Sequence, residues 1–259
     1  MAVRNRLKVQ LRDGAPAVGT AITMSATDSM ELLARMNFDW LFIDTEHAPL
    51  NSEMLAQLLQ VARLGKATPL VRVAWNDPVV IKKALDAGAM GVVVPWVNTR
   101  EQAIMAVRAA KYPPLGTRGF GPRWLLLAGE DLPEYNRTAN DEVLVVVQIE
   151  TAEAMENLEG ILTTPGVDAY MIGPADLANS LGFPGDFGNP AVERAIASIC
   201  ERASKLGIPG IYAPAPAEVC LRRLEQGFRA VCLGSDINFL RLGAQAALEK
   251  LGRPMYARD

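Results

Sequence analysis

Eight short runs rich in valine, isoleucine and leucine recur along this 259-residue chain, with longer segments of helical periodicity between them. Such alternation is typical of repeated strand and helix units around a parallel sheet, because both faces of each strand are buried and the strand is then almost wholly apolar. The expected strands cover 17–22, 40–43, 69–73, 91–94, 143–149, 169–172, 210–212 and 230–233. The expected helices cover 29–36, 52–64, 78–86, 100–110, 191–206, 216–225 and 238–251.

The number of units favours closure of the sheet. Eight strand and helix units in a chain of this length predict an α/β fold of the (β/α)8 TIM-barrel type, with residues 1–259 in a single domain. An open, doubly wound sheet is the alternative. It has less support, because no GxGxxG motif follows the first strand, and the segment 119–121 lacks both the third glycine and the preceding strand of a dinucleotide site.

Local signals mark the starts of several helices. Asn51 is expected to cap the helix that follows it, and Asp77 to cap a helix that begins at Pro78. The segment 27–29 is expected to cap the first helix in the same way.

The stretch 112–140 is unusually long for a connection in a compact domain. We expect short helices near 124–127 and 134–138 within it. A segment of this kind is expected to serve as a lid or as a contact between subunits.

The composition narrows the classes of function. The formal charge is −3 and the basic residues are scattered, which gives no electrostatic basis for binding nucleic acid. Cys200, Cys220 and Cys232 have no metal-binding spacing and are expected to be buried, reduced thiols. The chain start has no signal-peptide core, and no apolar run is long enough to span a membrane, so we expect a cytoplasmic protein without a membrane partner.

Polar residues collect just after the expected strands. In a parallel barrel these carboxyl-terminal positions face one basin, so their side chains are expected to form a site. The positions hold Asp44, Glu46, His47, Arg72, Gln148, Glu150, Asp176 and the segments 173–175 and 234–236.

His47 is the only histidine in the chain and follows the second expected strand. An imidazole titrates near neutral pH, and Asp44, three residues earlier, is placed to orient it, so His47 is a candidate general base. The alternative is a solvated loop histidine without a catalytic role.

Glu150 and Asp176 follow adjacent strands of the expected barrel. Two oxygen donors without a neighbouring histidine or cysteine suit a hard divalent cation such as Mg or Mn better than a closed zinc site. The alternative is that each is an ordinary carboxylate in the first turn of a helix. A helix is expected to start near Asp176, and the segment 173–175 before it is expected to offer main-chain N–H groups to a small anion. Arg72 is expected to bind a carboxylate or enolate oxygen or else to form an internal salt bridge.

Three segments in this order, 38–48, 148–151 and 173–178, resemble the HpcH/HpaI aldolases, which are metal-dependent class II pyruvate aldolases. The resemblance extends over nearly the whole chain. It implies a (β/α)8 barrel that is often a hexamer built from dimers, in which the last helices are exchanged between subunits.

The resemblance also implies roles for the candidate residues. Glu150 and Asp176 become the ligands of a divalent metal ion, with Mg, Mn, Co or Zn as possible occupants. Arg72 becomes the residue that binds the 2-oxo acid and stabilises its enolate. Asp44 and His47 become a dyad that relays a proton with a metal-bound water.

Further positions are expected to contact substrate. The resemblance implies that Gln148 and the main chain of Gly173 and Ala175, with Pro174 between them, contact the pyruvate portion. Asp86 becomes a supporting acid near the site.

The reaction implied is reversible cleavage of a 4-hydroxy-2-oxo acid to pyruvate, or hydroxypyruvate, and an aldehyde. The segment 122–127 is more apolar than the resemblance predicts for binding a dicarboxylic acceptor. Three alternatives are a lyase that acts on an acyl thioester like a citrate lyase subunit, a metal-free barrel that binds phosphate at 234–236, and a catalytically silent barrel kept as an oligomer scaffold.

Overall fold

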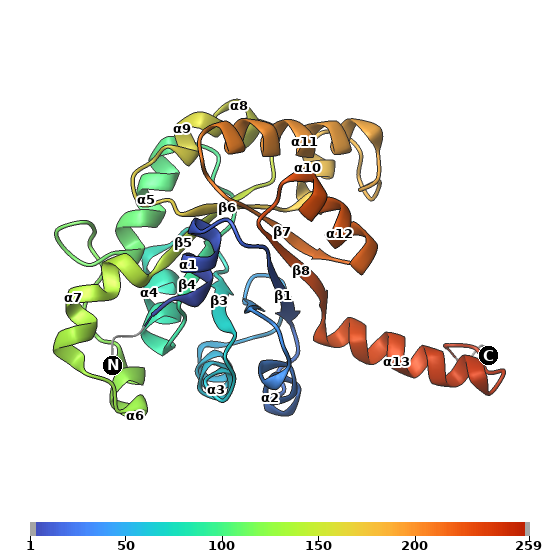
Figure 1. The fold of residues 1–259 in the computed structure, drawn as a ribbon, viewed down its shortest axis with the longest axis horizontal. Coiled ribbons are helices and arrows are strands. Elements are labelled where there is room, and N and C mark those ends of the chain that lie inside the picture. Colours follow the sequence, from blue (N-terminus) through green and yellow to red (C-terminus); the bar gives the residue numbers. More distant parts are fainter. Residues whose placement is uncertain (1–3, 257–259) are drawn as a thin grey trace.

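The eight strands form one closed barrel in the computed structural model, which describes residues 4–256 (Figure 1). Each strand pairs in parallel with the next in chain order, and β8 closes the barrel on β1. The strands are β1 (Ala17–Ile22), β2 (Trp40–Asp44), β3 (Thr68–Arg72), β4 (Gly91–Val94), β5 (Leu144–Ile149), β6 (Ala169–Ile172), β7 (Gly210–Ala215) and β8 (Ala230–Ser235). The predicted (β/α)8 barrel is thereby confirmed, and the differences from the predicted strands lie at strand ends.

Helices connect the strands and cover the outside of the barrel (Figure 1). They are α1 (Arg6–Arg12), α2 (Thr27–Arg35), α3 (Ser52–Ala62), α4 (Pro78–Ala87), α5 (Arg100–Ala110), α6 (Arg123–Ala128), α7 (Leu132–Glu142), α8 (Ala152–Glu156), α9 (Leu158–Leu162), α10 (Pro174–Ser180), α11 (Pro190–Lys205), α12 (Ala217–Gln226) and α13 (Asp236–Lys250). The two short helices predicted within 112–140 are present as α6 and α7. The prediction omits α1, α8 and α9.

Capping explains where several helices begin. The side chains of Asn51 and Asp77 accept hydrogen bonds from main-chain N–H groups in the first turns of α3 and α4, as predicted. The predicted cap at 27–29 is wrong, because α2 already begins at Thr27 and its N-cap residue, Ala26, makes no side-chain hydrogen bond.

The core has two apolar layers, because successive strand residues face opposite sides of the barrel wall. In β2, Phe42 belongs to the cluster that fills the barrel interior, whereas Leu41 and Ile43 pack outward against the helices. Leu7 and Leu11 of α1 join the interior cluster and close the amino-terminal end of the barrel. The polar residues that follow the strands lie at the opposite, carboxyl-terminal end.

The last helix, α13, departs from this compact arrangement. Figure 1 shows it leaving β8 and extending away from the barrel. Three of its large apolar side chains are exposed, and so is the leucine that follows the helix: Ile237, Leu240, Leu242 and Leu251. Phe239, near the start of the helix, is partly buried against the core.

Two predictions from composition are tested by the fold. All three cysteines are free and buried, as expected. Within residues 4–256 no helix is long and apolar enough to cross a membrane. Residues 1–3, which belong to the segment in which no signal peptide was expected, lie outside the described residues.

Candidate active site

Arg72 and Asp44 form the central ion pair at the carboxyl-terminal end of the barrel. They are the last residues of β3 and β2, and the strand register places them directly opposite each other. Arg72 Nε and Nη2 donate to the two oxygens of Asp44 at 2.9 and 2.7 Å, and Nη1 lies 3.1 Å from Glu46 Oε2. Of the two readings of Arg72 left open by the sequence, the internal salt bridge is therefore present.

The ion pair fixes the charges of its members. Burial would raise the pKa of Asp44, but the hydrogen bonds and charge of Arg72 outweigh burial and hold that pKa below its usual range. Burial would lower the pKa of Arg72, and the same pair raises it instead. Burial also raises the pKa of Glu46, although Arg72 opposes the shift. The guanidinium of Arg72 therefore keeps its positive charge and is held in one orientation.

His47 lies at the edge of this network, with 64% of its side chain exposed. Asp44 Oδ1 accepts hydrogen bonds from the main-chain N–H groups of Glu46 and His47, at 3.1 and 3.4 Å. Asp44 therefore orients the turn that carries His47, while the imidazole Nε2 lies 3.8 Å from Glu46 Oε2. The sequence reasoning placed Glu46 in the basin but gave it no role.

Glu150 follows β5 and is almost completely buried, with 1% of its surface exposed. Its Oε1 accepts a hydrogen bond of 2.8 Å from the main-chain N–H of Trp96, and its Oε2 accepts one from Gln148 Nε2. Burial raises the pKa of Glu150 to about 7, and the negative charges of Asp176 and Glu46 contribute to the rise. This carboxyl group is thus buried with more negative than positive charge around it.

Gly173 and Asp176 are brought to Glu150 by the connection from β6 to α10. That helix begins at Pro174, earlier than the start near Asp176 predicted from the sequence, with Gly173 as its N-cap residue. A Cβ at residue 173 would collide with Glu150 Oε2 and lie 2.7 Å from Gln148 Nε2, so only glycine leaves room here. Asp176 lies in the first turn of α10, close enough to raise the pKa of Glu150.

These residues fit a divalent cation that keeps open coordination positions. Among residues 4–256 no group of three or more His, Cys, Asp or Glu side chains is arranged to hold a metal ion, so the protein would offer at most two such ligands. Glu150 and Asp176 would supply two oxygen ligands, and water and substrate the others, as hard cations such as Mg allow. Gln148 Oε1 is buried without a hydrogen-bond partner in the described structure, so a polar group of the cluster is left for a bound molecule.

Two predicted features are not part of this cluster. Asp86 lies in the last turn of α4, which runs back toward the amino-terminal end of the barrel, and it accepts a hydrogen bond of 2.7 Å from Arg118 Nη2. The expectation that Asp86 lies near the site does not hold within this chain. The segment 234–236 forms hydrogen bonds within the protein. The side chain of Asp236 accepts them from the main-chain N–H groups of Thr23, Met24 and Ile237.

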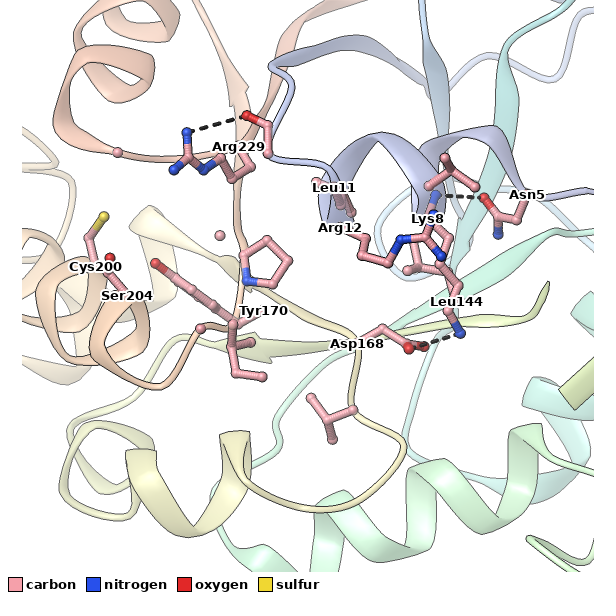
Figure 2. Close-up of a pocket in the computed structure, with 18 of the residues that line it drawn as sticks. Asn5, Lys8, Leu11, Arg12, Leu144, Asp168, Tyr170, Cys200, Ser204 and Arg229 are labelled. Carbon is pink, nitrogen blue, oxygen red and sulfur yellow. Dashed lines mark hydrogen bonds and ion pairs between the residues drawn. The ribbon is translucent and has the colours of Figure 1, made fainter. Parts of the chain in front are cut away.

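A cavity of about 590 Å³ opens at the other end of the barrel (Figure 2). Most of its charged side chains already have internal partners. Lys8 pairs with Asp168 at 2.9 Å, Glu142 accepts the main-chain N–H of Asn5, and Arg229 donates to a main-chain carbonyl. The unmatched buried charge lies at the carboxyl-terminal end, so we assign the candidate active site there.

The chain is similar to proteins of one family over most of its length. Residues 22–241 match the family model described as HpcH/HpaI aldolase/citrate lyase. A 4-hydroxy-2-oxo-heptane-1,7-dioate aldolase of Shigella flexneri is 40% identical over 257 residues, which covers 96% of this chain and 94% of that protein.

Solved structures agree with this relationship. A HpcH/HpaI aldolase/citrate lyase family protein from Burkholderia cenocepacia J2315 superposes with a TM-score of 0.91 at 34% identity, covering 96% of this chain and 99% of that one. The citrate synthase SbnG superposes with a TM-score of 0.86 at 29% identity, covering 96% of this chain and 98% of that one. The resemblance inferred from three segments of sequence is thus confirmed: the protein is an enzyme of the aldolase type, and the chain belongs to the HpcH/HpaI aldolase/citrate lyase family.

Proposed function

We propose that this protein is a divalent-metal-dependent class II aldolase that reversibly cleaves 4-hydroxy-2-oxo acids to pyruvate, or hydroxypyruvate, and an aldehyde. The observation that carries the proposal is the environment of Glu150. Its buried carboxylate has Asp176 and Glu46 as negative neighbours, Arg72 as a positive one, and Gly173 against its Oε2. The name of the Shigella flexneri relative supports the same class of reaction.

Glu150 and Asp176 are the proposed metal ligands. The repulsion between these two carboxylates, which raises the pKa of Glu150, is relieved when a cation binds between them. Gly173 leaves the space beside Glu150 free of a side chain, and Gln148 Oε1 has no protein partner among the described residues. Mg, Mn, Co and Zn are the candidate ions, and the oxygen donors favour Mg or Mn.

A bound divalent cation would supply an electron sink for the 2-oxo group of the substrate. The chain itself supplies a fixed positive charge: Arg72 is held by Asp44 and Glu46, so its guanidinium stabilises the developing enolate without rearranging. Preorganised donors of this kind typically contribute about 3 to 4 kcal/mol. They act only in the transition state, which is why their loss reduces kcat.

His47 is the proposed general base of cleavage. It accepts the proton of the C4 hydroxyl while the bond between C3 and C4 breaks, and the electron pair of that bond passes into the enolate of the 2-oxo acid. Protonation at C3 then gives pyruvate. The large exposed fraction of the His47 side chain lets the imidazole exchange its proton with water between turnovers.

The pyruvate portion is proposed to contact Gln148 and the segment Gly173, Pro174 and Ala175. Gln148 offers the unpartnered Oε1, and the segment forms the start of α10, where main-chain N–H groups favour a carboxylate. Both lie against Glu150, so a 2-oxo acid bound there adjoins the proposed metal ligands.

The phosphate-binding alternative finds no support in the geometry. The main-chain donors at the start of α13 that would hold a phosphate are occupied by the side chains of Asp236 and Ser235. The family description includes citrate lyase, but the relative that is 40% identical is named as an aldolase, so the aldolase reaction is favoured over one on a thioester substrate.

Pyruvate release by the chelator-stripped protein tests the proposal. A panel of 4-hydroxy-2-oxo acids is incubated before and after addition of Mg, Mn or Co, with Glu150→Gln as the inactive variant and Glu218→Gln, an exposed carboxylate on α12, as the matched control. We expect turnover only with metal, and only in the wild type and the control. Turnover that survives both chelation and Glu150→Gln would remove the metal from the scheme.

The assembly and location belong to the same proposal. We expect a homo-oligomer, a hexamer in which α13 is exchanged between subunits, because this helix leaves the barrel with four exposed large apolar side chains on it or just after it. Light scattering that gives a monomer would contradict it. Three free, buried cysteines support a cytoplasmic location, which fractionation of cells would test.

A further inference from the structure

Two tryptophans lie side by side at the carboxyl-terminal end of the barrel. Trp75 follows β3 and Trp96 follows β4, and their ring centroids are 6.4 Å apart with the ring planes at 33°. Both are exposed, Trp75 at 56% and Trp96 at 38%. We call them the tryptophan pair.

The pair is attached directly to the candidate active site. The main-chain N–H of Trp96 donates to Glu150 Oε1 at 2.8 Å, so the residue that carries one indole also holds a proposed metal ligand. Trp75 lies three residues beyond Arg72, which binds Asp44 and Glu46. The two indoles therefore stand at the rim of the basin in which the 2-oxo acid is proposed to bind.

Folding alone does not account for a tryptophan at position 96. Its φ is 55°, and it is the one non-glycine residue with positive φ in the described part of the chain. Glycine adopts this conformation at little cost, whereas a bulky side chain is strained there. The indole recovers only part of the possible gain from burial in return, because 38% of the residue remains exposed.

Both segments are held rigidly. Asn76 Nδ2 donates to the carbonyl of Gln102 on α5, which anchors the segment after β3. The side chain of Gln102 accepts the N–H of Asn98, whose own side chain accepts a hydrogen bond from Thr151. A rigid aromatic surface loses little entropy when a ligand contacts it.

The charges around the pair indicate what it would contact. Neither 73–77 nor 94–98 contains a lysine or an arginine, and the nearest acid in sequence, Asp77, is used as a helix cap. An additional carboxylate on the substrate would find no cation in these segments. An apolar or aromatic chain would instead contact indole rings, which favour such partners.

We infer that the tryptophan pair binds the part of the substrate that becomes the aldehyde, and that it selects apolar or aromatic acceptors over carboxylate-ended ones. This inference rests on the proposed function, because it takes the 2-oxo acid end to be fixed by Arg72, Gln148 and the metal ligands. It separates this chain from its relative of Shigella flexneri, whose name specifies a dioate.

Binding of two 2-oxo acids that cannot be cleaved tests the inference. Because 2-oxo-4-phenylbutanoate and 2-oxoadipate lack the C4 hydroxyl, calorimetry on the Mn-loaded protein measures affinity for the tail without turnover. The variants are Trp75→Ala and Trp96→Ala. Leu64→Ala, which removes a 52% exposed side chain just after α3 at the amino-terminal end of the barrel, is the matched control.

We expect the wild type and the control to bind the phenyl compound at least about tenfold more tightly than the diacid. Each tryptophan substitution should reduce that preference about three- to tenfold, as expected for loss of one aromatic contact, and Trp75→Ala should leave pyruvate affinity unchanged. The kcat/KM for a phenyl-substituted 4-hydroxy-2-oxo acid should fall by the same factor. If Trp96→Ala fails to fold, Trp75→Ala, whose backbone is unstrained, carries the test alone.

Two kinds of result would overturn the inference. One is a wild type that prefers the diacid, or tryptophan variants whose tail preference equals that of the wild type. The other is a change in oligomer mass on Trp75→Ala with an unchanged tail preference, which would assign the pair to a subunit contact. Failure of the proposed function looks different, because the wild type would then neither bind pyruvate nor turn over any substrate with metal.

Discussion

Replacing Glu150 by glutamine should stabilise the metal-free protein at alkaline pH. In the folded chain, burial raises the pKa of this carboxyl group to about 7, from 4.5 in the unfolded chain. A raised folded pKa means that the group favours folding below the unfolded value and that this contribution is lost as the pH rises through 7. A difference of about 2.5 in pKa, at about 1.4 kcal/mol each, makes the charged group cost about 3 kcal/mol by pH 8.

Urea unfolding of chelator-stripped protein at pH 5 and pH 8 measures this cost. Glutamine keeps the size of the side chain and accepts the same N–H of Trp96, but it cannot ionise. We expect the stability of Glu150→Gln relative to wild type to rise by about 2 to 3 kcal/mol between the two pH values. The exposed control Glu218→Gln should show no such change.

The same experiment with Mn connects stability to the proposed site. A cation that binds between Glu150 and Asp176 should stabilise the wild type at pH 8 and leave Glu150→Gln nearly unaffected. If wild type and Glu150→Gln show the same pH dependence without metal, the carboxyl group is not held in the environment described, and the reasoning about its charge is wrong.

Three further substitutions probe the other parts of the site. Arg72→Lys keeps the positive charge but loses the forked guanidinium that binds Asp44 and Glu46. Steady-state pyruvate release should therefore show kcat/KM reduced about 10²- to 10³-fold. Near-wild-type values would exclude the arginine from enolate stabilisation. His47→Ala should reduce kcat about 10²- to 10⁴-fold while thermal melting stays close to wild type, because the imidazole is mostly exposed; an unchanged kcat would remove His47 as the base. Gly173→Ala places a Cβ against Glu150 Oε2. It should weaken Mn binding in calorimetry and lower the free energy of unfolding in urea by about 1 to 3 kcal/mol. Tight Mn binding would instead show that the cluster tolerates a side chain there.

The barrel could be predicted from the sequence because its signals are local and repeated. Runs such as 91–94 and 169–172 are apolar throughout, and the structure contains strands with those same bounds. Errors occur where the signal depends on neighbours. The first helix, predicted to be capped within 27–29, has Thr27 inside it, and α1 was missed because its two buried leucines acquire meaning only at the end of a closed barrel.

The site was predictable in composition but not in contacts. Strand ends bring Asp44, Arg72 and Glu150 to one basin, as barrel geometry requires. Which oxygen meets which nitrogen depends on the strand register, and the register pairs Asp44 with Arg72. Trp96 was missed because its contribution is a main-chain N–H set by a positive φ, and residue type carries no sign of it.

The two ends of the barrel differ in how completely their polar groups are paired, and this difference locates the candidate active site. At the amino-terminal end most of the cavity charges are paired, as Lys8 is with Asp168, so a ligand that binds these groups would have to displace an existing partner. At the carboxyl-terminal end Glu150 and the oxygen of Gln148 are buried with fewer partners than they can accept, which costs folding free energy. A cation and a 2-oxo acid would supply the missing partners of Glu150 and Gln148, and these new interactions would contribute to the binding free energy. Gly173 leaves room beside Glu150 and the main-chain N–H of Trp96 holds Glu150 Oε1, so neither fills the space that the ligands would occupy.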